Sequence, residues 1–107
     1  MDFKQIRFTE IAKLELEETL DYIQKELLNP KAAKRLLAKV FNTIERISLL
    51  PESYPCIEND FVLRKDIRKA VVGKYLLYYH YDSVEKIITI LRFVYAKSSH
   101  DSLLKQI

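Results

Sequence analysis

The 107-residue chain has one cysteine and one glycine, and it has no long apolar run. With a single cysteine, Cys56, it forms no internal disulfide, which agrees with a reducing compartment. Cys56 has no Cys or His partner at a useful spacing, so neither a metal site nor a thiol nucleophile is indicated. No apolar stretch approaches the roughly 18 residues that span a bilayer, and the N-terminus MDFKQIRF lacks the apolar core of a signal peptide. We therefore expect a cytoplasmic protein with no membrane segment.

The composition that remains is typical of a small globular protein. The chain is 49% hydrophobic and 31% charged, and its length predicts a single domain over residues 1–107. The net charge of +3 is unevenly distributed. Residues 1–53 hold nine basic and nine acidic residues, whereas residues 54–107 hold nine basic and six acidic residues. A mildly basic half suits contact with a polyanion or an acidic protein, although +3 alone is also unremarkable.

The first half of the sequence predicts a strand and two helices. Residues 3–8 alternate between polar and apolar positions, as in a short strand. Thr9 is a suitable N-cap for a helix that reaches about Leu28. Its apolar face consists of Ala12, Leu16, Leu20, Ile23 and Leu27.

Asn29 and Pro30 then favour the start of a second helix, which ends before Pro51. Its apolar stripe consists of Ala33, Leu36, Leu37, Val40, Phe41, Ile44 and Ile47. The turn between the two helices is short, so they should pack as an antiparallel hairpin.

The second half is rich in strands after the loop LPESYPCIEND. We expect a short strand at residues 61–63 and longer strands at residues 67–72, 75–81 and 86–95. Gly73 and Lys74 form a tight turn, and residues 96–107 are a polar tail. The order β-α-α-β-β-β predicts an α+β fold, with a helical hairpin packed on a small, mostly antiparallel sheet.

The stretch RKAVVGKYLLYYHYD carries four tyrosines within seven positions. Alternation puts Tyr75, Tyr79 and Tyr81 on one face of the strand and Tyr78 and His80 on the other. One face must pack on the helices. The other is expected to present aromatic rings beside Arg68, Lys69 and Arg92, a combination that could stack on bases and hold phosphates. The alternative is structural, because tyrosine is common in strands; His80 is then a paired structural residue or a partner contact.

The order of motifs resembles the RelE/ParE superfamily of toxins from bacterial type II toxin–antitoxin modules. The similarity runs from TEIAKLELEETLDYI through NPKAAKRLLAKVFNTIERI and SLLPESYP to IRKAVVGKYLLYYHYD and IITILRFVYAKSSHD. The resemblance implies the same α+β fold, a cognate antitoxin as partner, and no metal or other cofactor. RelE-like members cut mRNA in the ribosomal A site, whereas ParE-like members poison DNA gyrase.

The resemblance also implies site residues for the metal-free nuclease. Cleavage needs a base, a cationic group at the phosphate and an acid. The candidate catalytic residues are Arg68, Lys69, Tyr79 and His100, and the candidate groove residues are Arg64, Tyr75, Tyr81, Arg92 and Lys97. Two positions depart from the nuclease pattern. Leu76 stands where RelE-like nucleases carry Arg, and the tail AKSSHD lacks the usual Arg, with His100 near its place.

Three functions follow from these residues. The first is a ribosome-dependent mRNA endonuclease neutralised by an antitoxin. The second is a ParE-like gyrase inhibitor, which acts by protein binding and therefore tolerates the loss of catalytic side chains. The third is an inactive toxin fold that still binds its antitoxin. The endonuclease function predicts an interaction with ribosomes and mRNA. The gyrase-inhibitor function predicts an interaction with gyrase.

Overall fold

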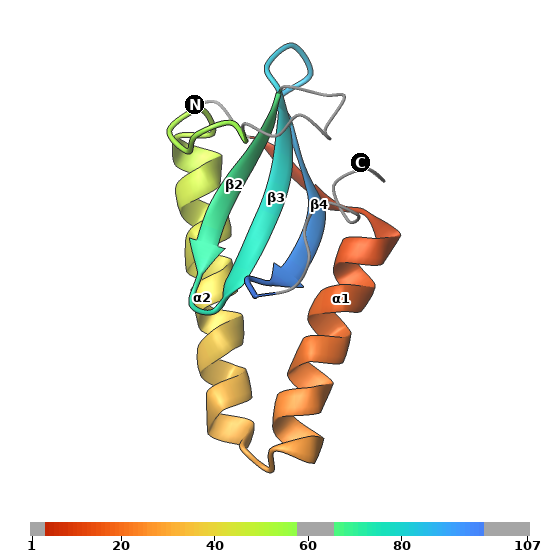
Figure 1. Ribbon diagram of the computed structural model, residues 1–107. Coiled ribbons are helices and arrows are strands. Elements are labelled where there is room, and N and C mark those ends of the chain that lie inside the picture. The colour runs from red at the N-terminus through yellow and green to blue at the C-terminus, as the bar shows by residue number, and fades with distance from the viewer. Residues whose placement is uncertain (1–3, 58–65, 98–107) are drawn as a thin grey trace.

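The computed structural model describes residues 4–57 and 66–97, which form two helices, one π-helical turn and four strands (Figure 1). In chain order these are β1 (Gln5–Phe8), α1 (Glu10–Asp21), η1 (Tyr22–Glu26), α2 (Pro30–Leu49), β2 (Ile67–Val72), β3 (Tyr75–Asp82) and β4 (Ile87–Tyr95). The helix starts agree with the sequence, because Thr9 and Asn29 cap α1 and α2 by accepting bonds from Ala12 N and Ala32 N.

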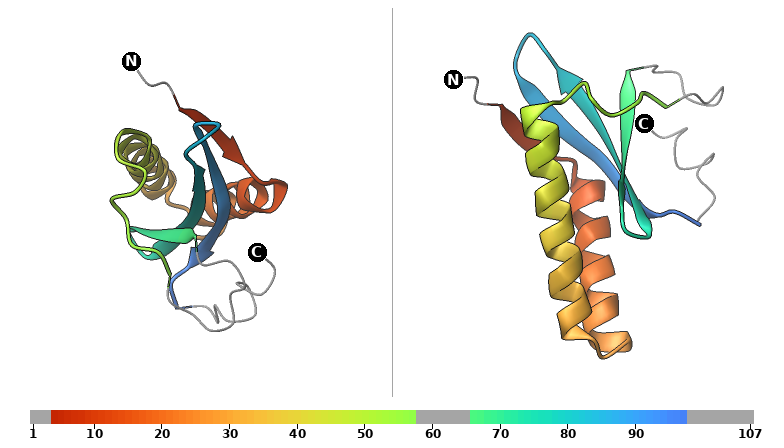
Figure 2. Two further views of the ribbon diagram at one scale, coloured as in Figure 1. Left: turned by 90° about the horizontal axis from the view of Figure 1, so that it is seen from above. Right: turned by 90° about the vertical axis from the view of Figure 1, so that its left-hand side faces the viewer.

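The described strands form one sheet in the order β1-β4-β3-β2. β1 pairs with β4 in parallel, and the β4–β3 and β3–β2 pairs are antiparallel. Both helices lie against the same face of this sheet (Figure 2), with α1 along β4 and α2 along β2. The predicted α+β fold and element order are confirmed. The expected strand at residues 61–63 lies outside the described residues.

The main core lies between the helical hairpin and the sheet. Val40 and Ile47 of α2 and Leu77 and Tyr79 of β3 have essentially no exposed surface there. Alternation along β3 also brings Tyr75 and Tyr81 to this side. The opposite face carries a smaller cluster built from Ile67, Tyr78 and Val94. Both faces of the tyrosine-rich strand therefore bury aromatic rings.

Two residues expected in the helical core are exposed instead. Leu27 is 56% exposed, because the chain passes through the π-helical turn η1 and loses the 3.6-residue period that placed Leu27 beside Ile23. Phe41 is 59% exposed because it lies at the edge of the buried stripe of α2, where the described residues provide nothing to cover it.

Candidate functional site

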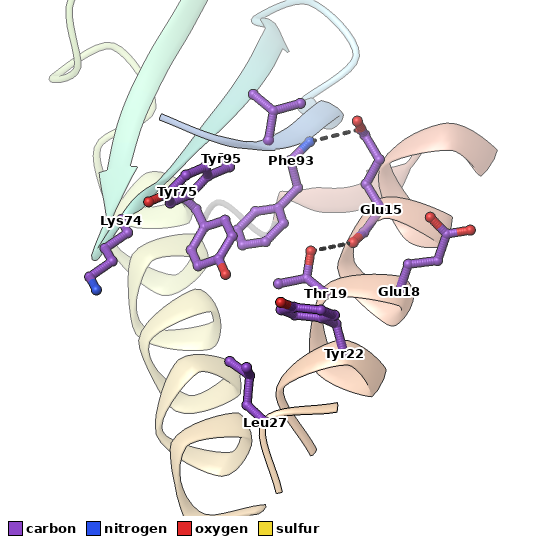
Figure 3. Close-up of a pocket in the computed structure, with 10 residues that line it drawn as sticks. Glu15, Glu18, Thr19, Tyr22, Leu27, Lys74, Tyr75, Phe93 and Tyr95 are labelled. Atoms are coloured by element: carbon purple, nitrogen blue, oxygen red, sulfur yellow. Dashed lines mark hydrogen bonds between the residues drawn. The ribbon is translucent and has the colours of Figure 1, made fainter. Parts of the chain in front are cut away.

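A groove of about 840 Å³ opens between α1, η1 and the adjoining ends of β3 and β4 (Figure 3). We call it the aromatic groove. It is lined by Glu15, Glu18, Thr19, Tyr22, Leu27, Lys74, Tyr75, Phe93, Val94 and Tyr95. Four aromatic rings from three different elements thus converge on one concave surface, as is typical of a binding site.

The inner wall of the groove is a stack of rings. Tyr75 stacks on Phe93 with ring centroids 5.1 Å apart and an interplanar angle of 16°, and Tyr95 approaches Tyr75 at 5.7 Å. Burial raises the pKa of Tyr75 above its usual value, and the neighbouring Tyr95 and Tyr22 phenols act in the same direction. The Tyr75 hydroxyl therefore stays protonated at neutral pH and can donate a hydrogen bond.

A β-bulge in β4 brings Phe93 into this wall. Tyr78 pairs with Arg92 whereas Tyr79 pairs with Ile90, so Leu91 is an extra residue in β4. Ile90 faces the helices before the bulge, and Phe93 faces them after it. In a regular strand Phe93 would point away from the groove, because alternate residues face opposite sides.

Glu15 of α1 lies at one end of the groove and accepts hydrogen bonds from residues of β4. Its two carboxylate oxygens accept bonds from Arg92 Nε at 2.9 Å and Arg92 Nη2 at 2.8 Å. Glu15 Oε1 also accepts a bond from the backbone N–H of Phe93 at 3.1 Å. β1 pairs with β4 only as far as Ile90, so a helix side chain takes over where the strand ends. The expected role of Arg92 in an open cationic groove is not supported, because its side chain is only 7% exposed.

Arg68 and Tyr79 are cross-strand neighbours that bind the segment after α2. Arg68 Nη1 donates to the carbonyl oxygens of Glu52 at 3.0 Å and Tyr54 at 2.5 Å. The Tyr79 hydroxyl donates to the carbonyl oxygen of Pro51 at 2.7 Å. The motif LPESYP is thus held against β2 and β3 by the side chains of Arg68 and Tyr79.

These contacts give Tyr79 a structural role rather than the expected catalytic one. Tyr79 has no exposed surface, so its hydroxyl cannot reach a substrate in this conformation. Burial raises its pKa from 10.0 to about 12, although the Arg68 guanidinium opposes the shift. A phenol with that pKa is a poor proton donor at neutral pH.

The other predicted site residues are dispersed. Lys69 is half-buried on the face opposite the helices, paired with Tyr78, while Arg68 points to the helix side. Tyr81 packs against the main core, and Lys97 is exposed and does not line the aromatic groove. Only Tyr75, of the described candidates, contributes to the groove. Arg64 and His100 lie outside the described residues.

His80 forms the pair expected of a structural residue. Its Nε2 atom lies 2.7 Å from a carboxylate oxygen of Asp66. Within residues 4–57 and 66–97, no group of three His, Cys, Asp or Glu side chains could hold a metal ion. No helix in these same ranges is long and apolar enough to cross a membrane.

Sequence reasoning missed Glu15, Tyr22 and Phe93 as groove residues. Glu15 carries a local signal, since it is an acidic residue beside the apolar face of α1. Phe93 carries none, because the bulge that turns it toward the helices depends on the pairing of β4 with β3. Tyr22 lies in η1, where the chain departs from the α-helical period that was used to predict the apolar face of the first helix.

The raised pKa of Tyr79 predicts a loss of stability at alkaline pH. The unfolded chain releases the Tyr79 proton near pH 10, whereas the folded protein holds it until about pH 12. Stability is therefore complete below pH 10 and falls as the pH rises toward 12, by about 2–3 kcal/mol from this group. We expect urea unfolding to show this fall in the wild type and a clearly smaller one in Tyr79→Phe. Equal falls in the two proteins would contradict the assignment.

Comparison with known proteins identifies one family and several similar structures. The sequence profile of the family described as "ParE toxin of type II toxin-antitoxin system, parDE" matches residues 6–99. No curated protein is significantly similar to the chain in sequence.

Three solved structures share its fold. The chromosomal ParDE toxin–antitoxin system from P. aeruginosa has 13% identity and a TM-score of 0.69, over 89% of this chain and 98% of that one. The toxin–antitoxin complex RelBE2 from Mycobacterium tuberculosis has 21% identity and a TM-score of 0.57, over 88% and 99%. The archaeal RelE–RelB complex from Pyrococcus horikoshii OT3 has 17% identity and a TM-score of 0.53, over 92% and 100%.

Proposed function

Because the chain belongs to the ParE toxin family of type II toxin–antitoxin systems, we propose that it inhibits growth by binding DNA gyrase and is held inactive by a cognate antitoxin. The observation that carries this proposal is the state of the catalytic candidates. The catalytic candidates Arg68 and Tyr79 use their polar atoms in hydrogen bonds within the fold, and so does the groove candidate Arg92. Inhibition by protein binding does not require these side chains to be free for catalysis.

The mRNA endonuclease is the second candidate function. Lys69 on the face opposite the helices and the exposed Lys97 remain accessible for contact with phosphates. General acid–base cleavage also needs a titratable group within hydrogen-bond reach of the reacting oxygen. Of the catalytic candidates that the structure describes, Tyr79 does not meet that need, because it is buried; His100 lies outside the described residues. The nuclease therefore has less support than inhibition by binding.

The antitoxin is the partner that best fits the aromatic groove. The sequence suggested a face where aromatic rings lie beside the basic side chains of Arg68, Lys69 and Arg92. The groove instead combines four aromatic rings with Glu15 and Glu18, and Lys74 is its one lysine or arginine among the described lining residues. An antitoxin segment with apolar anchors and a cation opposite Glu18 would match this surface, in the manner of a helix or strand laid into a groove. The resemblance of the fold to solved toxin–antitoxin complexes supports a partner of this class.

Two assays on one preparation test the proposed target. The toxin is purified away from its antitoxin and added to a gyrase supercoiling reaction and, in parallel, to programmed ribosomes whose mRNA 5′ ends are mapped. We expect supercoiling to be inhibited and the mRNA to stay intact, and supercoiling to recover when the antitoxin is restored. A-site cuts that disappear in Lys69→Ala would establish the nuclease instead. Unchanged supercoiling and uncut mRNA, together with no growth arrest on expression, would indicate an inactive toxin fold.

A further inference from the structure

The two helices of the hairpin carry opposite charge. Residues 10–26, which form α1 and η1, hold six acidic and two basic side chains. Helix α2 holds five Lys or Arg residues and a single acidic residue, Glu45. The two helices pack against different strands, α1 against β4 and α2 against β2 (Figure 1). The first half of the sequence has no net charge, but its acidic and basic side chains therefore lie on different helices.

Most of the positive charge on α2 falls on one line. We call this line the α2 basic stripe; it consists of Lys31, Arg35, Lys39 and Arg46, all of them exposed. Spacings of four, four and seven residues keep these side chains on one face of a helix. The opposite face carries the buried Leu36, Val40 and Ile47. At 1.5 Å per residue the stripe is about 22 Å long.

The stripe is not explained by the stability of the fold. Among the residues that the structure describes, no carboxylate forms an ion pair with any of its four cations. Like charges four residues apart, as in Lys31–Arg35 and Arg35–Lys39, destabilise a helix by a few tenths of a kcal/mol per pair. The charges of the stripe thus slightly destabilise the isolated protein. An anionic ligand bound to them would make their contribution to stability favourable.

The C-terminal half of the stripe borders a depression of about 190 Å³ between α2 and the β2–β3 turn. Lys39, Asn42 and Arg46 line it from the helix, and Gly73 lines it from the turn. Gly73 has φ +59°, and the position of an added Cβ would lie 3.9 Å from Lys39 Nζ. Two cations and an amide donor therefore border a shallow hollow whose other wall consists of Val71, Val72 and Gly73. Such a hollow can seat a phosphate group.

We propose that the α2 basic stripe binds the phosphate backbone of duplex DNA. A rigid line of cations suits the regular backbone of a duplex, and such contacts position a protein without reading the sequence. Proteins that bind single strands instead add aromatic rings on which bases stack. The stripe has no aromatic member, since Phe41 lies off its line beside Glu45.

Fluorescence anisotropy with a short labelled duplex DNA tests the stripe. The wild-type chain is titrated at several salt concentrations from about 50 to 200 mM, and the affinity is expected to fall steeply with salt. The variant Arg35→Glu/Lys39→Glu should bind at least about tenfold more weakly, with a salt slope shallower by about 2, because two phosphate contacts are lost. The variant turns the Lys31–Arg35 repulsion into an attraction and leaves one like-charge pair, at positions 35 and 39, so its melting temperature should stay close to that of the wild type.

A matched control separates the stripe from net charge. Lys13→Glu/Lys25→Glu changes the charge by the same amount on α1 and η1, where both lysines are exposed. We expect its affinity for the duplex to stay within about twofold of wild type. Equal losses in the two variants, or tighter binding to single-stranded RNA or poly-glutamate than to the duplex, would overturn the proposal. The assay contains no gyrase, so its outcome does not depend on the proposed target.

Discussion

Glu15→Ala is expected to lower the free energy of unfolding by about 3–5 kcal/mol, the cost typical of breaking a buried ion pair from one side. The Arg92 and Glu15 side chains are only 7% and 19% exposed, so water screens the pair weakly. The substitution removes the carboxylate that pairs with the Arg92 guanidinium and that also accepts the hydrogen bond of the Phe93 N–H. The unfavourable burial of a charge and of a backbone donor then adds to the lost packing.

Urea unfolding at neutral pH measures this effect, with two variants for comparison. Glu15→Gln keeps an oxygen for the Phe93 N–H but loses the charge, so its loss of stability should be intermediate. Glu18→Ala alters an exposed carboxylate on the same helix, and it should change stability by no more than about 0.5 kcal/mol. The assignment is wrong if Glu15→Ala and Glu18→Ala have the same effect.

Tyr75→Ala is expected to weaken antitoxin binding by about 2–4 kcal/mol, which corresponds to roughly 30- to 1,000-fold in Kd. This prediction rests on the proposed antitoxin role of the aromatic groove. Tyr75 stacks on Phe93 and contacts Tyr95, so its ring forms the centre of the wall. Central aromatic residues in a concave surface commonly dominate the affinity of an interface.

Calorimetry or surface plasmon resonance with the antitoxin from the same operon provides the measurement. Tyr75→Phe retains the ring and should lose much less affinity than the alanine variant. Tyr22→Ala removes a 55% exposed ring from the opposite wall, so it tests the groove with little risk to the core. Val71→Ala, at an exposed position outside the groove, should have no effect. Unchanged affinity in both Tyr22→Ala and Tyr75→Ala would show that the antitoxin binds to another surface of the protein.

The predicted elements that agree with the structure depend on local chemistry. Thr9 and Asn29 each cap a helix because their side-chain oxygens accept a bond from the N–H three residues later. Gly73 marks the β2–β3 turn because that position has φ +59°, which glycine adopts without strain. Such interactions span a few residues, so the sequence pattern contains them in full.

The deviations occur where distant segments meet. The bulge at Leu91 is fixed by the pairing of β4 with β3, and it reverses which side of the sheet Phe93 faces. The π-helical turn η1 likewise moves Leu27 from the expected core to the groove. A shift of one residue in register reverses every later side chain in a strand, and a local pattern does not encode it.

The sequence by itself determined the order of elements and the α+β class, because caps, turns and hydrophobic periods are local, and the order of its motifs resembles that of the toxin family. In the structure, the pairing of β2 with β3 makes Arg68 and Tyr79 cross-strand neighbours. Only the tertiary structure decided what those side chains do. The helical hairpin and the Pro51–Tyr54 segment cover that side of the sheet, so the Arg68 and Tyr79 side chains, both expected to be catalytic, donate hydrogen bonds to backbone carbonyls of that segment. Burial depends on which face the rest of the chain covers, and that choice is made by contacts between residues far apart in the sequence.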